Sequence, residues 1–153
     1  MTLLCTAMGG PNNSFYWEKN GTIIGNHSTV NLVGIDASQG GDYTCTVSNA
    51  AGSDSVSTTL YVAPYIITLE EQVLTVNGSD VNISCNADGF PAPVVTWINI
   101  LDVVVSNTSQ LLFTSVLFGD EGVYYCVPSI EINGTKFSTR NGTTLISKWI
   151  STE

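Results

Sequence analysis

Apolar and polar residues alternate along short segments of this chain, which is the pattern of β-strands that bury one face. Val81, Ile83 and Cys85 alternate with the polar Asn82 and Ser84. Because successive side chains of a strand point to opposite faces, the cysteine and its two aliphatic neighbours are predicted to point inward. The same spacing of two predicts further inward sets at Leu3, Cys5 and Ala7, at Phe15 and Trp17, and at Val95 and Trp97.

The sequence has no stretch with helical periodicity. Apolar residues nowhere recur at i, i+3, i+4 and i+7 over three turns, and Gly, Asn and Ser interrupt the chain at the spacing of short strands. We therefore predict an all-β protein.

The pattern occurs twice along the chain. In each half a Trp follows a Cys by twelve residues, and a second Cys follows the first by about 40. An internal repeat of this kind indicates two copies of one structural unit. We predict domains at residues 1–63 and 64–153. The two sets are Cys5, Trp17 and Cys45, and Cys85, Trp97 and Cys126.

The segment before the last cysteine carries a recognisable motif. Asp120, Gly122, Tyr124 and Cys126 fit the pattern D-x-G-x-Y-x-C, and the first half keeps its Gly and Tyr but has Gln39 in place of the Asp. Together with the upstream Cys and Trp, this motif resembles that of immunoglobulin domains. The resemblance covers nearly the whole chain.

The resemblance implies two tandem immunoglobulin-like β-sandwiches of the I-set or C2 type, the first lacking its N-terminal strand because few residues precede Cys5. The spacing of about 40 residues between cysteines leaves too few residues for the C′ and C″ strands of variable domains. The implied disulfides are Cys5 with Cys45 and Cys85 with Cys126, and the implied core residues are Trp17, Trp97, Tyr43 and Tyr124.

The charge balance excludes two classes of partner. Four Lys and Arg against 13 Asp and Glu give a net charge of -9, which repels nucleic acid and anionic lipid surfaces alike. No apolar run approaches the roughly 18 residues of a membrane span, and no secretory signal follows Met1. We expect the chain to be soluble as it stands or a piece of a longer protein, with membrane attachment only through a segment outside it.

Metal binding and free thiols are the alternatives to disulfides, but zinc sites use closely spaced Cys or His ligands. The chain has one histidine, His27, which is predicted to lie on a surface loop. Asp120 and Glu121 are neighbours on a turn, so their carboxylates should diverge. We therefore expect no enzyme activity, no small-molecule substrate, no cofactor and no metal.

Sequons for N-glycosylation are in excess. Eight of the 13 asparagines lie in N-x-[S/T], where chance would give roughly three. Turn chemistry alone would account for Asn20, Asn133 and Asn141, but not for the others. With the disulfides, the excess indicates an extracellular glycoprotein. The predicted sites are Asn12, Asn20, Asn26, Asn77, Asn82, Asn107, Asn133 and Asn141.

The favoured function is an extracellular binding module for cell adhesion or cell-surface recognition, at the cell surface rather than secreted. Its partner would be a protein on a cell or in matrix, including a second copy. The alternatives are the ectodomain of an enzyme-linked receptor, such as a receptor tyrosine kinase or phosphatase, and a secreted matrix protein with immunoglobulin repeats. Strand alternation predicts a binding face at Tyr16, Glu18, Thr44, Thr46, Ser48, Thr59 and Tyr61.

Overall fold

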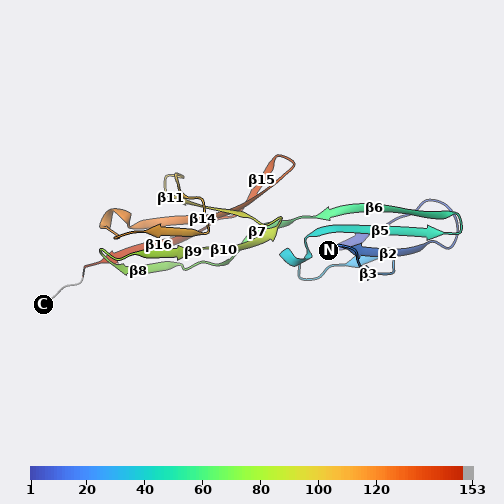
Figure 1. Cartoon of the computed structure of the whole chain (residues 1–153), viewed down its shortest axis with the longest axis horizontal. Helices are drawn as coiled ribbons and strands as arrows, with labels where there is room; N and C mark the ends of the chain where they lie inside the picture. The colour runs from blue at the N-terminus through green and yellow to red at the C-terminus, as the bar shows by residue number, and fades with distance from the viewer. Residues whose placement is uncertain (150–153) are drawn as a thin grey trace. The chain divides into compact units, whose positions relative to one another are not determined.

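The computed structural model describes residues 1–149 and divides the chain into two compact units, Met1–Val62 and Ala63–Glu153. We call them unit 1 and unit 2 and describe each by itself. β-strands make up most of both units, which confirms the all-β prediction (Figure 1).

Unit 1 contains a four-stranded antiparallel sheet in the order β3-β2-β5-β6 and a two-stranded sheet of β1 and β4. The Trp strand, β2, pairs with the strand that carries the second cysteine, β5. The elements are β1 Thr2–Leu4, β2 Ser14–Lys19, β3 Thr22–Gly25, β4 Thr29–Asn31, the 3-10 helix η1 Ala37–Gln39, β5 Gly41–Asn49 and β6 Gly52–Leu60.

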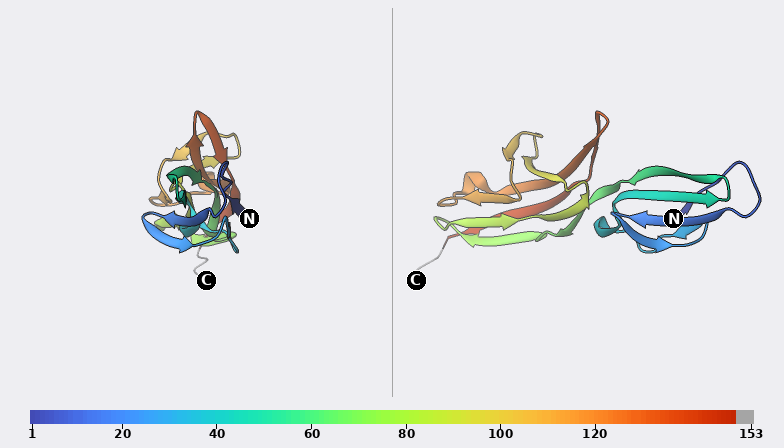
Figure 2. Two further views of the ribbon diagram at one scale, coloured as in Figure 1. Left: turned by 90° about the vertical axis from the view of Figure 1, so that its right-hand side faces the viewer. Right: turned by 45° about the vertical axis from the view of Figure 1, so that its right-hand side comes forward.

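Unit 2 repeats this plan with additional strands. Its main sheet has the order β12-β11-β14-β16-β8, and β15 pairs with β14 in a hairpin that extends from the body of the unit (Figure 2). Two smaller sheets pair β10 with β7 and β13 with β9. The elements are β7 Val62–Thr68, β8 Gln72–Val76, β9 Val81–Ser84, β10 Asn86–Phe90, β11 Val94–Asn99, β12 Val104–Ser106, β13 Gln110–Phe113, η2 Phe118–Asp120, β14 Gly122–Ile132, β15 Thr135–Ser138 and β16 Asn141–Lys148.

Both units contain a strand at the C′ position, so the expectation that the cysteine spacing leaves no room for it was wrong. β3 pairs with β2, and β12 pairs with β11. In unit 1 the two-residue turn at Asn20 and Gly21, both with positive φ, joins the strands with almost no connecting chain. A short hairpin therefore fits within a spacing of 40 residues.

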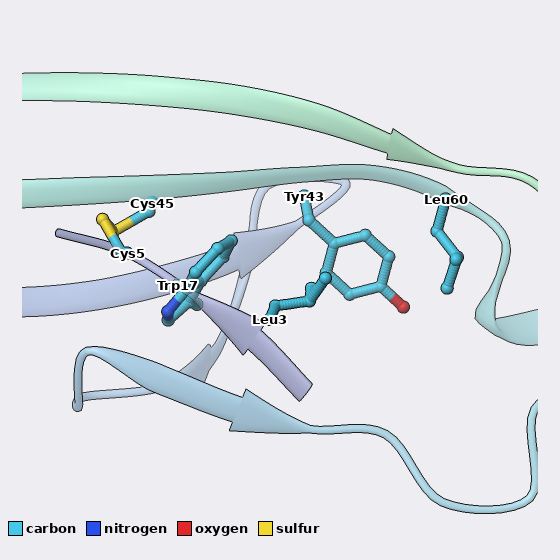
Figure 3. Packing of buried hydrophobic residues seen from close by; sticks show 6 residues of the cluster. All are labelled: Leu3, Cys5, Trp17, Tyr43, Cys45 and Leu60. Carbon is cyan, nitrogen blue, oxygen red and sulfur yellow. A yellow bond between two sulfur atoms is a disulfide. The ribbon is translucent and has the colours of Figure 1, made fainter. Parts of the chain in front are cut away.

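The core of each unit forms around a tryptophan and a disulfide. Figure 3 shows the Trp17 ring lying between the Cys5–Cys45 disulfide and Tyr43. In unit 2 Trp97 is completely buried beside the Cys85–Cys126 disulfide. The structure thus contains the two disulfides that the family resemblance implied.

A tyrosine hydroxyl stabilises the turn before each second cysteine; Tyr43 is buried and Tyr124 is partly buried. The Tyr43 hydroxyl donates to the carbonyl of Gln39 at 2.6 Å, and the Tyr124 hydroxyl donates to the carbonyl of Asp120 at 2.8 Å. Burial raises the pKa of both phenols, so they remain protonated donors at neutral pH.

The units differ at the last strand of the main sheet. In unit 2, β8 pairs in parallel with β16, and Thr143 on the inner face of β16 is 1% exposed. The matching residue of β6, Thr58, is exposed, because unit 1 has no counterpart of β7 or β8 among its described strands. Val56 on the same strand is 61% exposed. The observation agrees with a first domain that lacks its N-terminal strand.

Removing the hydroxyl of Tyr43 or of Tyr124 should lower the stability of its unit. Tyr43→Phe and Tyr124→Phe leave the ring packed but lose one hydrogen bond to backbone, so each should reduce the free energy of unfolding by about 1 kcal/mol. Urea unfolding followed by circular dichroism measures the change. The exposed Tyr61→Phe is the control and should lie within about 0.5 kcal/mol of the parent. Variants of Tyr43 and Tyr124 as stable as the parent would contradict this role.

Candidate protein-binding faces

The main sheet of unit 1 turns one face inward and one outward. Residues opposite each other in an antiparallel pair share a face, and Tyr16 lies opposite Thr46 while Glu18 lies opposite Thr44. The residues between them, Trp17 and Cys45, are buried, so these four point outward. The unit 1 face therefore comprises Tyr16, Glu18, Thr44, Thr46, Ser48 and Thr59 of the predicted set.

Tyr61, the seventh predicted member, lies beyond the end of β6. It is 44% exposed, between the buried Leu60 and Val62. Tyr16 pairs with Thr46, which pairs with Ser55 of β6, and Tyr61 lies six positions along the chain from Ser55, or roughly 20 Å in an extended strand. The two tyrosines therefore cannot act as one anchor.

The polar groups of the unit 1 face are partly paired with one another. The hydroxyls of Thr44 and Ser57 lie 2.8 Å apart, and the Thr59 hydroxyl donates to the Asp42 carboxylate at 2.6 Å. One exposed apolar residue, Ile23 of β3, lies opposite Glu18 on this face. Sequence reasoning missed Ile23 because it did not predict β3, although the Asn20–Gly21 turn was a signal for the hairpin.

The corresponding face of unit 2 carries more apolar residues than the unit 1 face. Thr96 lies opposite Val127, and Ile98 lies opposite both Tyr125 and Val104, all on the side away from the buried Trp97. Sequence reasoning missed these residues, although alternation from Trp97 and Cys126 was a signal for them. We call this surface the β11–β14 face; it comprises Val94, Thr96, Ile98, Val104, Val123, Tyr125, Val127, Ser129, Gly142, Thr144, Ile146, Lys148, Gln72, Leu74 and Val76.

Seven of the eight sequon asparagines are exposed, including Asn82, which lies next to the buried Ile83 on β9. Asn77 is the exception. It is partly buried, and its side-chain oxygen is enclosed without a hydrogen-bond partner. A glycan is therefore harder to accommodate at Asn77 than at the other sites.

The adjacent carboxylates of Asp120 and Glu121 make hydrogen bonds that stabilise the fold. Asp120 accepts from the Leu117 amide at 2.9 Å, and Glu121 accepts from both the amide and the hydroxyl of Ser147 at 2.8 Å. His27 is exposed in the connection after β3. Across residues 1–149, no three His, Cys, Asp or Glu side chains are grouped as metal ligands would be. None of the helical segments in that range has the length and apolar character needed to cross a bilayer.

Comparisons with known proteins agree with this architecture. The family model described as "Immunoglobulin domain" matches residues 1–49 and 63–129. The chain is 30% identical to Hemicentin-1 of Mus musculus over 83% of its own length, and 32% identical to Neural cell adhesion molecule L1.1 of Danio rerio over 82%. It spans only 3% and 12% of those proteins.

Among solved structures, the chain is similar to the N-terminal four Ig domains of Dscam1 isoform 7.44. The TM-score is 0.66 at 22% sequence identity, over 97% of this chain and 41% of that one. At this identity the likeness establishes the fold alone.

Material secreted from a eukaryotic host should carry glycans whose occupancy follows exposure. We expect Asn82→Gln to remove the mass of one N-glycan and Asn77→Gln to leave the mass almost unchanged. Intact mass spectrometry before and after enzymatic removal of N-glycans tests this, since the bare chain has a mass of 16.3 kDa. A chain that leaves the secretory pathway without any glycan would contradict the interpretation of the sequons.

Proposed function

The chain belongs to the immunoglobulin family, and from this premise we propose that it is an extracellular binding module for cell adhesion or cell-surface recognition. It acts by protein–protein contact and carries no catalytic activity of its own. A relative named as a neural cell adhesion molecule supports this proposal.

The proposal rests mainly on one observation: in each unit, the residues that stabilise the core and the residues that face outward lie on opposite sides of the same strands. Inward positions are filled by the disulfide, Trp and Tyr, whereas the side chains on the outward face of the same strands are at least partly exposed. A rigid sheet with a solvent-exposed face can present side chains to another protein at little cost in conformational entropy. The carboxylates that could have served catalysis are used in structural hydrogen bonds.

We place the partner-binding surface of unit 1 at its outward face. Tyr16 is its only large aromatic anchor, and tyrosine is enriched among residues that dominate binding energy. Glu18 and the surrounding hydroxyls supply hydrogen bonds. A small, polar contact of this kind is weak by itself and gains strength from many copies on apposed cells.

We further propose a location at the cell surface rather than in matrix. The alternatives are a secreted matrix protein with immunoglobulin repeats and the ectodomain of an enzyme-linked receptor. The downstream reading frame distinguishes the three. A membrane-spanning segment with a short tail supports surface adhesion, a kinase or phosphatase domain supports the enzyme-linked receptor, and further immunoglobulin repeats support matrix.

The test uses beads coated with the chain, scored for self-aggregation and for binding to candidate cells. Tyr16→Ala should reduce binding by about thirty-fold or more, because truncating a hot-spot side chain costs at least about 2 kcal/mol. Tyr61→Ala is the matched control, since it removes the same side chain about 20 Å away, and it should bind like the parent. If a folded Tyr16→Ala variant binds as well as the parent, the assignment of the binding surface to the unit 1 face is wrong. Absence of any binding by the parent would contradict the proposed function.

A further inference from the structure

The two disulfides differ in their contact with solvent. Cys85 and Cys126 in unit 2 are both 0% exposed, whereas Cys5 in unit 1 is 5% exposed. Cys5 and Cys45 also line a surface cavity of about 110 Å³. One water molecule in the liquid takes up about 30 Å³, so this cavity has room for a thiol group and the carbon next to it. The unit 1 disulfide is therefore within reach of a small reagent.

Unit 2 covers its disulfide with strands that unit 1 lacks. Ile66 of β7, Leu69 and Val73 of β8 pack against the core cluster that contains the unit 2 disulfide. The apolar residues packed around the unit 1 cluster come only from β2, β4 and the connection after β4. The residues after Cys85 form β10 by pairing with β7, whereas the residues after Cys5 form no strand before β2. Since no strand of unit 1 corresponds to β7 or β8, its disulfide has an open side.

A larger cavity adjoins the one beside the unit 1 disulfide. It has a volume of about 460 Å³ and shares Thr6, Val47 and Asp54 with the smaller cavity. Asp54 is the only charged residue among those that line the two cavities. A thiolate that approaches the disulfide here meets the field of a carboxylate, and a positive charge on the same reagent offsets that repulsion. The two cavities therefore suit a small thiol that carries an ammonium group.

We propose that the Cys5–Cys45 disulfide is a site of reversible thiol–disulfide exchange in the folded chain, and that it reacts with small cationic thiols. The thiolate of the reagent attacks Sγ of Cys5, the more exposed of the two cysteines. A bond forms between the reagent sulfur and Cys5 as the bond to Cys45 breaks. The electron pair leaves on the Cys45 sulfur, which takes a proton from water. The product is a mixed disulfide on Cys5, and attack by Cys45 reverses the step.

A second thiolate completes the reduction. It attacks the reagent sulfur of the mixed disulfide, so that Cys5 leaves as a thiolate and the reagent leaves as its own disulfide. Two thiols thereby supply the two electrons that the protein disulfide gains. Opening this bond releases a loop with a sequence separation of 40 residues, so unit 1 loses stability while unit 2 keeps its own bridge. The modification needs no binding partner and goes beyond the proposed function.

Timed reduction of the full chain tests the proposal. The chain is incubated with cysteamine under native conditions, quenched with acid and N-ethylmaleimide, and mapped by mass spectrometry. The Cys5–Cys45 bond should be reduced at least about ten-fold faster than the Cys85–Cys126 bond, with the mixed disulfide on Cys5 at early times.

A side chain that fills the cavity should protect the unit 1 disulfide. Val56 lines the cavity and is 61% exposed, so Val56→Trp adds bulk there without entering the core and should slow reduction of Cys5–Cys45 by about three-fold or more. Leu112→Trp is the matched control, because Leu112 is 65% exposed on β13 of unit 2. The control should react like the parent.

The charge of the reagent provides a second measurement. At equal thiolate concentration and low ionic strength, cysteamine should reduce Cys5–Cys45 at least about three-fold faster than the anionic mercaptoethanesulfonate. Asp54→Asn should remove most of this difference, because it replaces the carboxylate by a neutral amide of the same shape. Equal rates for the two reagents with the parent chain would overturn the preference for cationic thiols.

Three other results would overturn the proposal. One is equal rates of reduction for the two disulfides of the parent, and another is equal slowing by Val56→Trp and Leu112→Trp. The third is faster reduction of Tyr43→Phe. This substitution lowers the stability of unit 1, so it would accelerate a reaction that requires unfolding by about five-fold. Attack on the folded chain leaves the rate of Tyr43→Phe unchanged.

Discussion

A disulfide packed against a buried tryptophan is the constraint on which the rest of each unit depends. The bonds Cys5–Cys45 and Cys85–Cys126 close loops with sequence separations of 40 and 41 residues, and their Cα atoms lie 6.4 and 6.3 Å apart. Closing a loop of this length stabilises a domain by about 3 to 4 kcal/mol, a large share of a total of about 5 to 15 kcal/mol. The bond also fixes which side of two strands faces inward.

Once the inward side is fixed, the residues that alternate with the inward ones along those strands must point outward. Both units use the same inward residues, yet the outward face of unit 1 consists mainly of hydroxyls and carboxylates, whereas that of unit 2 has more Val, Ile and Tyr. The fold therefore separates stability from recognition. Surface residues can change without disturbing the core, and two copies of one framework can serve two different contacts.

The sequence predicted what depends on local alternation and on the repeat: the strands, the inward Trp and Cys residues, and the outward residues from Tyr16 to Thr59. It did not predict which distant strands pair, such as β8 with β16. Alternation shows which face of a strand is buried, but it does not show which strand lies next to it in the sheet. It placed Tyr61 on the unit 1 face because alternation does not show where a strand ends. The C′ strands were missed because counting residues overestimated the length of a hairpin turn.

The most direct test of this account is peptide mapping of the chain digested without reduction. The account predicts two linked pairs, the peptide with Cys5 joined to that with Cys45 and the peptide with Cys85 joined to that with Cys126. The same digest after reduction should release all four. A link between the units, such as Cys45 with Cys85, or free thiols in the folded chain, would contradict the assignment of inward and outward faces on which the proposed functions depend.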